Sequence, residues 1–264
     1  MAITKPFFVI PLDLGTIATG NETAGYPAKN LNRFKAIGLT WKSTGNTNVW
    51  ARGQFSAAQA IDFIGIISAN ALAGTQFRLR LGASQAAVDG TAGYDSGALT
   101  FINPSITRAD GLYHAHFELP SVQTFQWWRI DITGHTGDFQ ASDLILGRKI
   151  TPSRFYNWGW DQGVRDLGDM SVSRFGVFDE EPGTIFRTIN FTLAWQTEAE
   201  YEASFRPMIE TLGKRGVVFL AFDPTANTYR QSRTYLGFLE KPPVTSAQRK
   251  ALTYAQDFTL TSMI

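Results

Sequence analysis

Two histidines placed two residues apart are the first candidates for chemistry in this chain. His114 and His116 alternate with apolar residues across 113–119, a period typical of a β-strand, so the two imidazoles should share one face. Imidazoles at this spacing can hold a metal if Glu118, Asp131 or a more distant carboxylate supplies a third ligand. Two histidines on the polar face of a strand produce the same pattern without a ligand. We favour that interpretation and expect no metal.

The densest acidic run is Asp179–Glu181. Paired carboxylates can hydrolyse glycosidic bonds, but this run precedes Pro182-Gly183 and is more typical of a solvated turn between strands. The sequence contains no H-E-x-x-H, G-x-S-x-G, P-loop or G-x-G-x-x-G pattern. We therefore expect no catalytic residues, no cofactor and no enzymatic activity.

The tryptophans suggest a different use, because aromatic rings can stack on the apolar faces of sugars. Trp50 and Trp128, with His114 and His116, are the candidate carbohydrate-binding residues. Trp127 and Trp128 are adjacent in a strand-like segment, so their rings must point to opposite faces. One of the two should fill a core and the other should face outward.

Composition limits the class of protein more firmly than any motif. The 264 residues carry 24 Lys+Arg and 23 Asp+Glu, a net charge of +1, and include no cysteine. This excludes disulfide scaffolds, thiolate metal sites and the basic excess expected of nucleic-acid binding. No apolar stretch is long enough to span a membrane, and Phe7–Ile10 ends at Pro11, too short for a signal-peptide core. The 13% of aromatic residues exceeds the need of two cores and fits protein–protein contact.

The elements that must position these residues are mostly short strands. In the first half, alternating apolar segments are separated by loops rich in Gly, Asn and Asp. These segments are 61–67, 76–81, 113–119 and 127–132. Without a credible long helix, they predict an antiparallel β-sandwich over residues 1–150. The boundary falls near Gly147–Ser153, where Pro152 interrupts any ladder.

The second half, 151–264, contains one good helix, at about 198–212. Thr197 is a plausible N-cap with Glu200 three residues on, and Gly213 or Gly216 should end the helix. Pro207 should kink it. Strands are expected at 185–195, 217–222, 234–239 and 255–260. The chain is thus mainly β, with a β-rich barrel or sheet and one packed α-helix in its second half.

One group of segments resembles the discoidin-type modules. Gly25–Leu31 (GYPAKNL) is followed by Trp41–Ser43 (WKS), and 61–66, 77–80, 128–132 and 145–147 are similar to the family's later strands. The resemblance implies a galactose-binding-like jelly roll over about residues 10–150. It carries over no binding residue, and this chain lacks the cysteines with which many extracellular members join their ends.

A second group resembles tail proteins of long-tailed bacteriophages, of the distal-tail or tail-tip kind. Its segments are 191–195, the helix 198–212, 217–224, 235–237 and 258–260. The resemblance implies a subunit of a ring at the end of the tail tube, where hub and fibre proteins assemble. Many distal-tail proteins place the ring-forming domain first, whereas here the sandwich precedes it. The chain could therefore be the ring itself or a neighbouring tail-tip component.

The sequence interpretation is a non-enzymatic structural component of a phage tail tip or baseplate. Its expected partners are copies of itself in a ring, the tail tube and tail-tip or hub proteins, and its expected location is the virion, after assembly in the host cytoplasm. Nucleic-acid specificity and a membrane span are not expected. The alternative is a glycan-binding module that contacts carbohydrate on the host surface. The ring's copy number, its neighbours and the host receptor are left open.

Overall fold

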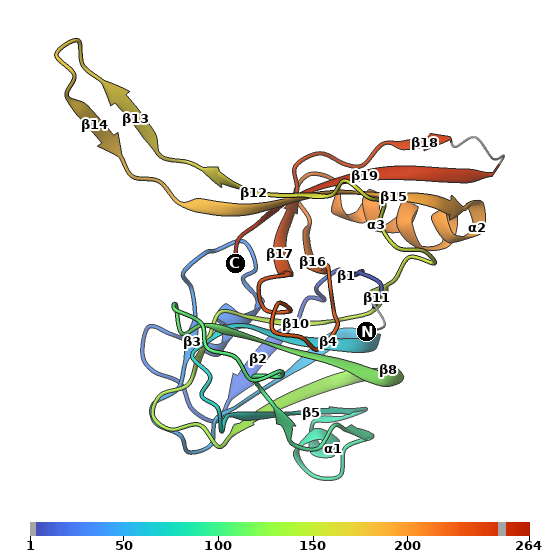
Figure 1. Cartoon of the computed structure of the whole chain (residues 1–264). Helices are drawn as coiled ribbons and strands as arrows, with labels where there is room; N and C mark the ends of the chain where they lie inside the picture. The colour runs from blue at the N-terminus through green and yellow to red at the C-terminus, as the bar shows by residue number, and fades with distance from the viewer. Residues whose placement is uncertain (1–3, 248–251) are drawn as a thin grey trace. The chain divides into compact units, whose positions relative to one another are not determined.

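The computed structural model describes residues 4–247 and 252–264 (Figure 1). The chain forms two compact units, one of Met1–Lys149 with Ala221–Thr234 and one of Ile150–Leu220 with Tyr235–Ile264. Antiparallel strands make up most of the regular structure in both. The expected fold class, mainly β with one packed helix, is confirmed.

The first unit is built on a sheet in which five strands follow the order β10-β4-β8-β5-β6, while β2 pairs with β4 and β7 with β5. Their bounds are β2 Thr16–Thr19, β4 Trp50–Ala69, β5 Gln76–Gly82, β6 Tyr94–Asp95, β7 Leu99–Thr100, β8 Tyr113–Thr133 and β10 Asp143–Gly147. The other elements of this part of the chain are β1 Phe7–Val9, η1 Ala28–Asn32, β3 Trp41–Lys42, α1 Gln85–Asp89, β9 Gln140–Ala141 and β11 Lys149–Ile150. β3 and β9 pair with each other in a separate small sheet.

Two long strands, β4 and β8, dominate this sheet. Their pairing shifts register at three places, between Gln54 and Gln59, Ile61 and Phe63, and Ile66 and Ala69 on the β4 side. Irregularities of this kind bend a strand and increase its twist. The predicted strands 113–119 and 127–132 are therefore the two ends of one bent strand.

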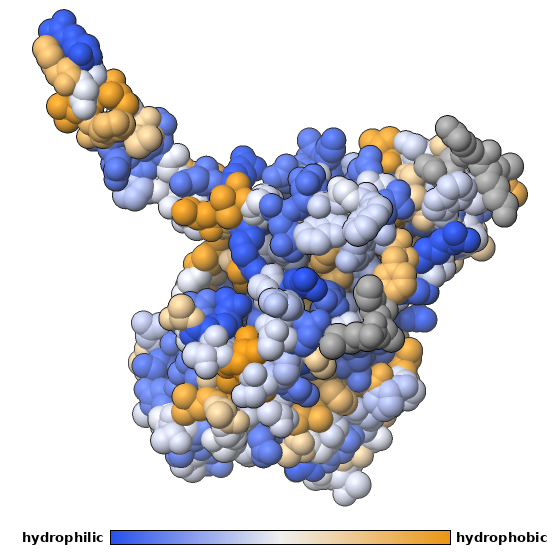
Figure 2. Space-filling model, viewed as in Figure 1, coloured by the Kyte–Doolittle hydropathy of each residue, from blue (hydrophilic) through white to orange (hydrophobic). Residues whose placement is uncertain are grey.

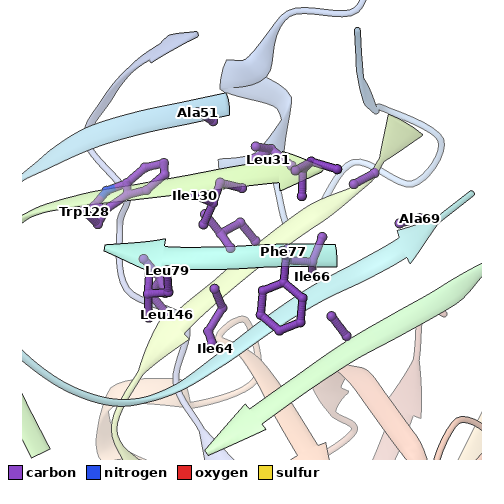
Figure 3. Packing of buried hydrophobic residues seen from close by; sticks show 14 of the residues in the cluster. Leu31, Ala51, Ile64, Ile66, Ala69, Phe77, Leu79, Trp128, Ile130 and Leu146 are labelled. Atoms are coloured by element: carbon purple, nitrogen blue, oxygen red, sulfur yellow. The ribbon is translucent and has the colours of Figure 1, made fainter. Parts of the chain in front are cut away.

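The core of the first unit lies on one face of the sheet. Phe77 and Leu79 of β5 pack beside Trp128 and Ile130 of β8, and all four side chains are buried (Figure 3). The intervening residues point the other way because side chains alternate along a strand. One face of β4, β8 and β5 is thus apolar, and the polar residues gather on the opposite face.

The second unit contains a sheet with the order β16-β17-β19-β15-β12, in which β18 also pairs with β19. The strands are β12 Asp161–Asp166, β15 Ile185–Thr197, β16 Val217–Ala221, β17 Thr234–Leu239, β18 Thr245–Ala247 and β19 Thr253–Ser262. A separate two-stranded ribbon pairs β13 Asp169–Val172 with β14 Phe178–Glu181. The predicted strands of this half are all present, with β17 matching its expected bounds.

The predicted helix runs continuously from α2 (Glu198–Glu200) through a π-helical turn, η2 (Tyr201–Phe205), into α3 (Arg206–Leu212). The Thr197 hydroxyl accepts the Glu200 N–H at 3.2 Å, so the N-cap is confirmed. The π turn ends at Phe205, two residues before Pro207, which has no N–H to give to a regular helical ladder. None of the helices in residues 4–247 and 252–264 is long and apolar enough to cross a membrane.

Candidate functional sites

Trp128, a candidate for sugar stacking, lies in the core of the first unit. Its ring is fully buried, and its Nε1–H donates to the Leu14 carbonyl at 3.1 Å. Trp127, the next residue, is on the opposite face of β8 and is partly exposed. A ligand has no access to the Trp128 ring, so the outward-facing member of the pair is Trp127.

His114 is also buried, and its ring Nδ1 and backbone groups are hydrogen-bonded within the protein. Its ring Nδ1 accepts the Ser68 N–H at 3.1 Å. Its backbone N–H donates to the Gln231 side-chain carbonyl at 2.8 Å. These contacts hold β8 to the end of β4 and to the loop between β16 and β17, which is a structural use of the residue.

His116 packs against the rings of Phe7 and Phe63, with centroid distances of 5.6 and 5.1 Å. Its Nε2 is 3.2 Å from Glu118, whose other oxygen accepts from Lys149 Nζ at 2.7 Å. Burial lowers the pKa of His116, which keeps the ring neutral near pH 7. Among the described residues, no group of three His, Asp or Glu side chains could hold a metal ion.

Trp50 is the predicted site residue that retains surface exposure, but its ring is covered by arginine. The guanidinium carbon of Arg129 lies 4.5 Å from the ring centroid and that of Arg52 lies 5.1 Å away. Such cation–π contacts occupy the ring face that a sugar would need. Trp50 and Trp128 therefore do not form one binding surface.

The arginines beside Trp50 belong to a charged row on the polar face of the sheet. Arg52, Arg129 and Arg80 stand directly opposite one another on β4, β8 and β5. Asp131 accepts from Arg80 and Arg129, each at 2.7 Å, and Asp89 of α1 pairs with Arg129 and Arg52. Two carboxylates thus separate three like charges that would otherwise repel across the strands.

Burial and hydrogen bonding act in opposite directions on the pKa of Asp89. Burial alone would raise the pKa of its carboxyl, but hydrogen bonds from Arg52 and Arg129 outweigh burial and lower it. The carboxylate stays ionised and the guanidinium groups stay paired. This network joins α1 to β4 and β8, and its hydrogen-bonding groups are used within the protein.

The second unit carries a surface of another kind, at residues 161–185, which we call the arm. The arm comprises β12, the edge strand of its unit's sheet, and the β13–β14 ribbon, which projects beyond that edge (Figure 1). Every arm residue except Gly168 is exposed. Asp179–Glu181, expected in a turn, lie in β14, whereas the ribbon's turn is at Ser173–Val177, where Gly176 has a φ of +77°. The tight turn falls at the glycine, which is the residue that tolerates this backbone conformation.

Eight large hydrophobic side chains of the arm are exposed, and orange patches are visible along the arm in Figure 2. They are Val164, Leu167, Met170, Val172, Phe175, Val177, Phe178 and Ile185. In the distal ribbon, Val172 pairs with Phe178 while Asp169 pairs with Glu181. Alternation puts Met170, Val172 and Phe178 on one face, together with Glu180 opposite Met170, and puts Asp169, Asp179 and Glu181 on the other. The ribbon is amphipathic, and its more apolar face is open.

A hollow of about 430 Å³ lies on the first unit, between the loop before β8 and the loop between β16 and β17. Its lining residues are Ser105, Ile106, Thr107, Arg108, Thr228, Gln231 and Ser232. Four of these seven side chains carry a hydroxyl group. Sequence analysis missed this hollow, since its two loops are more than 100 residues apart and neither contains a motif.

No protein-family model matches the sequence, and no curated protein is significantly similar to it. Solved structures similar to about half the chain include a chitosan-binding module of a chitosanase/glucanase from Paenibacillus sp. IK-5, at 14% identity and a TM-score of 0.36. This alignment covers 52% of the present chain and 97% of the module.

Two further similar structures are a fucose-binding module from Streptococcus pneumoniae and the family 32 CBM of C. perfringens NanJ, solved with galactose. The first has 6% identity, a TM-score of 0.39, and coverage of 52% of this chain and 96% of the module. The second has 12% identity, a TM-score of 0.40, and coverage of 54% and 99%. Identities and TM-scores this low assign no ligand to the present chain.

Proposed function

We propose that this protein is a structural subunit of an oligomeric assembly, in which the arm of one copy docks on a second copy of the chain. The observation that carries the proposal is the open apolar face of the arm. A two-stranded ribbon has no core of its own and is at best marginally stable in water. Contiguous exposed apolar surface on a soluble protein is typical of a binding interface.

Charge identifies a second copy as the occupant. The arm, residues 161–185, contains six acidic and two basic residues, a net charge of −4. The rest of the chain then holds 22 basic and 17 acidic residues, a net charge of +5. An acidic arm and a basic remainder attract each other between copies. Because the arm and its acceptor are different surfaces, the contact is heterologous and can close into a ring.

The experiment compares three full-length proteins by mass photometry and light scattering. The double variant Val172→Lys/Phe178→Lys places charges on the apolar face of the ribbon and should release monomers. Thr211→Lys adds a lysine to an exposed position of α3, outside the arm, and should remain assembled. A wild-type protein that is monomeric at micromolar concentration, or a double variant that assembles as the wild type does, contradicts the proposal.

The finer proposal places this assembly in the tail tip of a long-tailed phage, as the distal-tail ring or a component beside it. Its support is an arm suited to docking on a neighbouring subunit, together with the resemblance to such proteins of 191–195, 198–212, 217–224, 235–237 and 258–260. Tail tube and hub proteins are then the further partners. Immunogold electron microscopy of purified particles tests this role, and particles without label at the tail tip contradict it.

A second candidate function is the binding of glycan, in addition to assembly. The observation that favours it is the hollow on the first unit, with its four hydroxyl side chains. A glycan array probed with the full-length protein tests it. If none of the glycans on the array is bound, this candidate fails while the assembly proposal stands.

A further inference from the structure

The hollow on the first unit has the chemistry of a ligand site. Its volume of about 430 Å³ is within the range of about 300–1,000 Å³ found for small-molecule sites. A hydroxyl group can both donate and accept a hydrogen bond, and so can each hydroxyl of a sugar. Ile106 adds one apolar contact to this polar lining.

Three of the hydroxyls are available to a ligand. In the described part of the chain, the side chains of Ser105, Thr107 and Thr228 make no hydrogen bond to the protein, and all three residues are exposed. Ser232 is oriented instead by the protein, since its Oγ donates to the Tyr229 carbonyl at 2.9 Å. The hollow therefore offers free hydroxyls on both of its sides.

The charge of the hollow is neutralised within the protein. The Nε and Nη2 atoms of Arg108 donate to the two oxygens of Asp110 at 3.0 and 2.6 Å. The hydrogen bond from Arg108 lowers the pKa of Asp110 to about 2, so the pair is ionised on both sides at neutral pH. A hollow without net charge favours an uncharged ligand over an anion.

The wall formed by the loop between β16 and β17 is fixed in place. Gln231 is buried, and its side-chain amide holds both backbone groups of His114, at 2.8 and 2.7 Å. Tyr229, next to the lining residue Thr228, is 62% exposed, and the Arg233 guanidinium carbon lies 5.2 Å from its ring centroid. The loop is thus anchored by a buried side chain, and it carries an exposed aromatic ring at the position after Thr228.

We infer that the hollow between 105–108 and 228–232 binds a neutral pyranose unit of a glycan. The inference rests on the glycan-binding function given above as the second candidate, and it gives that function a location. The hydroxyls of Thr107 and Thr228 contact the sugar from opposite loops. Trp50, Trp128, His114 and His116 have no part in this site.

The test is saturation-transfer difference NMR of the full-length protein with galactose, glucose, mannose and fucose. Glucuronic acid is the charged comparison and sorbitol the acyclic one. The expected result is saturation transfer to at least one neutral pyranose and not to sorbitol. In Thr107→Val/Thr228→Val, which keeps the side-chain shapes, each lost hydrogen bond should weaken binding about two- to tenfold. Thr16→Val, which removes an exposed hydroxyl from β2, is the matched control and should bind as the wild type does.

The outcomes separate the site from the function. Sugar binding that survives unchanged in the double variant overturns the location and leaves glycan binding intact. If glucuronic acid is bound and none of the neutral sugars is, the inference that the ligand is neutral is wrong. If the wild type binds neither these sugars nor any glycan on the array, both the site and the function fail. Overlapping amide NMR spectra of wild type and variants would show that the variants are folded.

Discussion

The side-chain amide of Gln231 pairs with the backbone of His114, from a position 117 residues later in the chain. Gln231 Nε2 donates to the His114 carbonyl at 2.7 Å, and the His114 N–H donates to Gln231 Oε1 at 2.8 Å. The two hydrogen bonds pair the backbone of β8 near its N-terminal end, in the way that a neighbouring strand would. One side chain thereby fixes segment 221–234 within the first unit.

Replacing this side chain should therefore destabilise the first unit. Gln231→Ala removes the side-chain partner of a buried N–H and of a buried C=O, at a cost of about 1–3 kcal/mol for each group. Gln231→Glu keeps an acceptor for the N–H but sets a second oxygen against the His114 carbonyl, so it too should be less stable than the wild type. Urea unfolding monitored by tryptophan fluorescence gives the free energies. Gln54→Ala, at an exposed position of β4, is the control, and an unchanged midpoint for Gln231→Ala would refute the expectation.

Helices and strands whose apolar residues recur at regular spacing are predictable from the sequence. The helix at 198–212 and the strand at 234–239 were found because local spacing and caps determine them. The pairing of Gln231 with His114 could not be predicted, because nothing local marks either residue as a partner across 117 positions. The arm could have been found, since Asp169–Val172 alternates polar and apolar residues as a strand does.

Which of the two adjacent tryptophans is buried follows from the alternation of side chains along β8. Trp128 has the same parity as Ile130 and Ile132, which are buried, whereas Trp127 has the parity of Arg129. Parity along β8 therefore assigns Trp128 to the core. The stacking of Arg52 and Arg129 on Trp50 depends on cross-strand register, which the sequence does not specify.

Burial of Trp128 but not of Trp127 predicts very different losses of stability for their alanine variants. Trp128→Ala should cost about 3–5 kcal/mol, as expected for removing a buried aromatic ring. It also removes the donor to the Leu14 carbonyl. Trp127→Ala, on the other face of the same strand, should cost much less, and thermal unfolding distinguishes the two. Equal losses of stability in both variants would contradict the packing seen in Figure 3.

Asp143 predicts a pH dependence of stability. Burial raises the pKa of this carboxyl at the start of β10 from 3.8 to about 6. Between these two pKa values the folded state binds the proton more tightly than the unfolded state, so stability should fall as pH rises through this window. The full difference corresponds to about 3 kcal/mol.

Asp143→Asn should accordingly be more stable than the wild type at pH 7 to 8. It should also lose the decrease in the free energy of unfolding that Asp143 causes between pH 4 and 6. Denaturant unfolding across this pH range measures both. Asp138→Asn provides a control of opposite sign, since the hydrogen bond from the Gly45 N–H lowers the pKa of Asp138. That variant should be less stable than the wild type above pH 4. Stabilities of the wild type and Asp143→Asn that change in parallel from pH 4 to 6 would argue against a raised pKa at Asp143.

The charge of the arm predicts how assembly responds to salt. The acidic face of the ribbon, with Asp179 and Glu181, should be attracted to the rest of a second copy, which has a net positive charge. Added NaCl should weaken this association because it screens exposed charges. Ammonium sulfate should act in the opposite direction on the apolar face, because such salts strengthen the burial of apolar surface. Asp179→Asn/Glu181→Gln should flatten the NaCl dependence, whereas Glu210→Gln, on the exposed face of α3, should leave it as in the wild type. Mass photometry over a salt series measures these responses, and association that strengthens steadily with NaCl would show that apolar contact alone drives it.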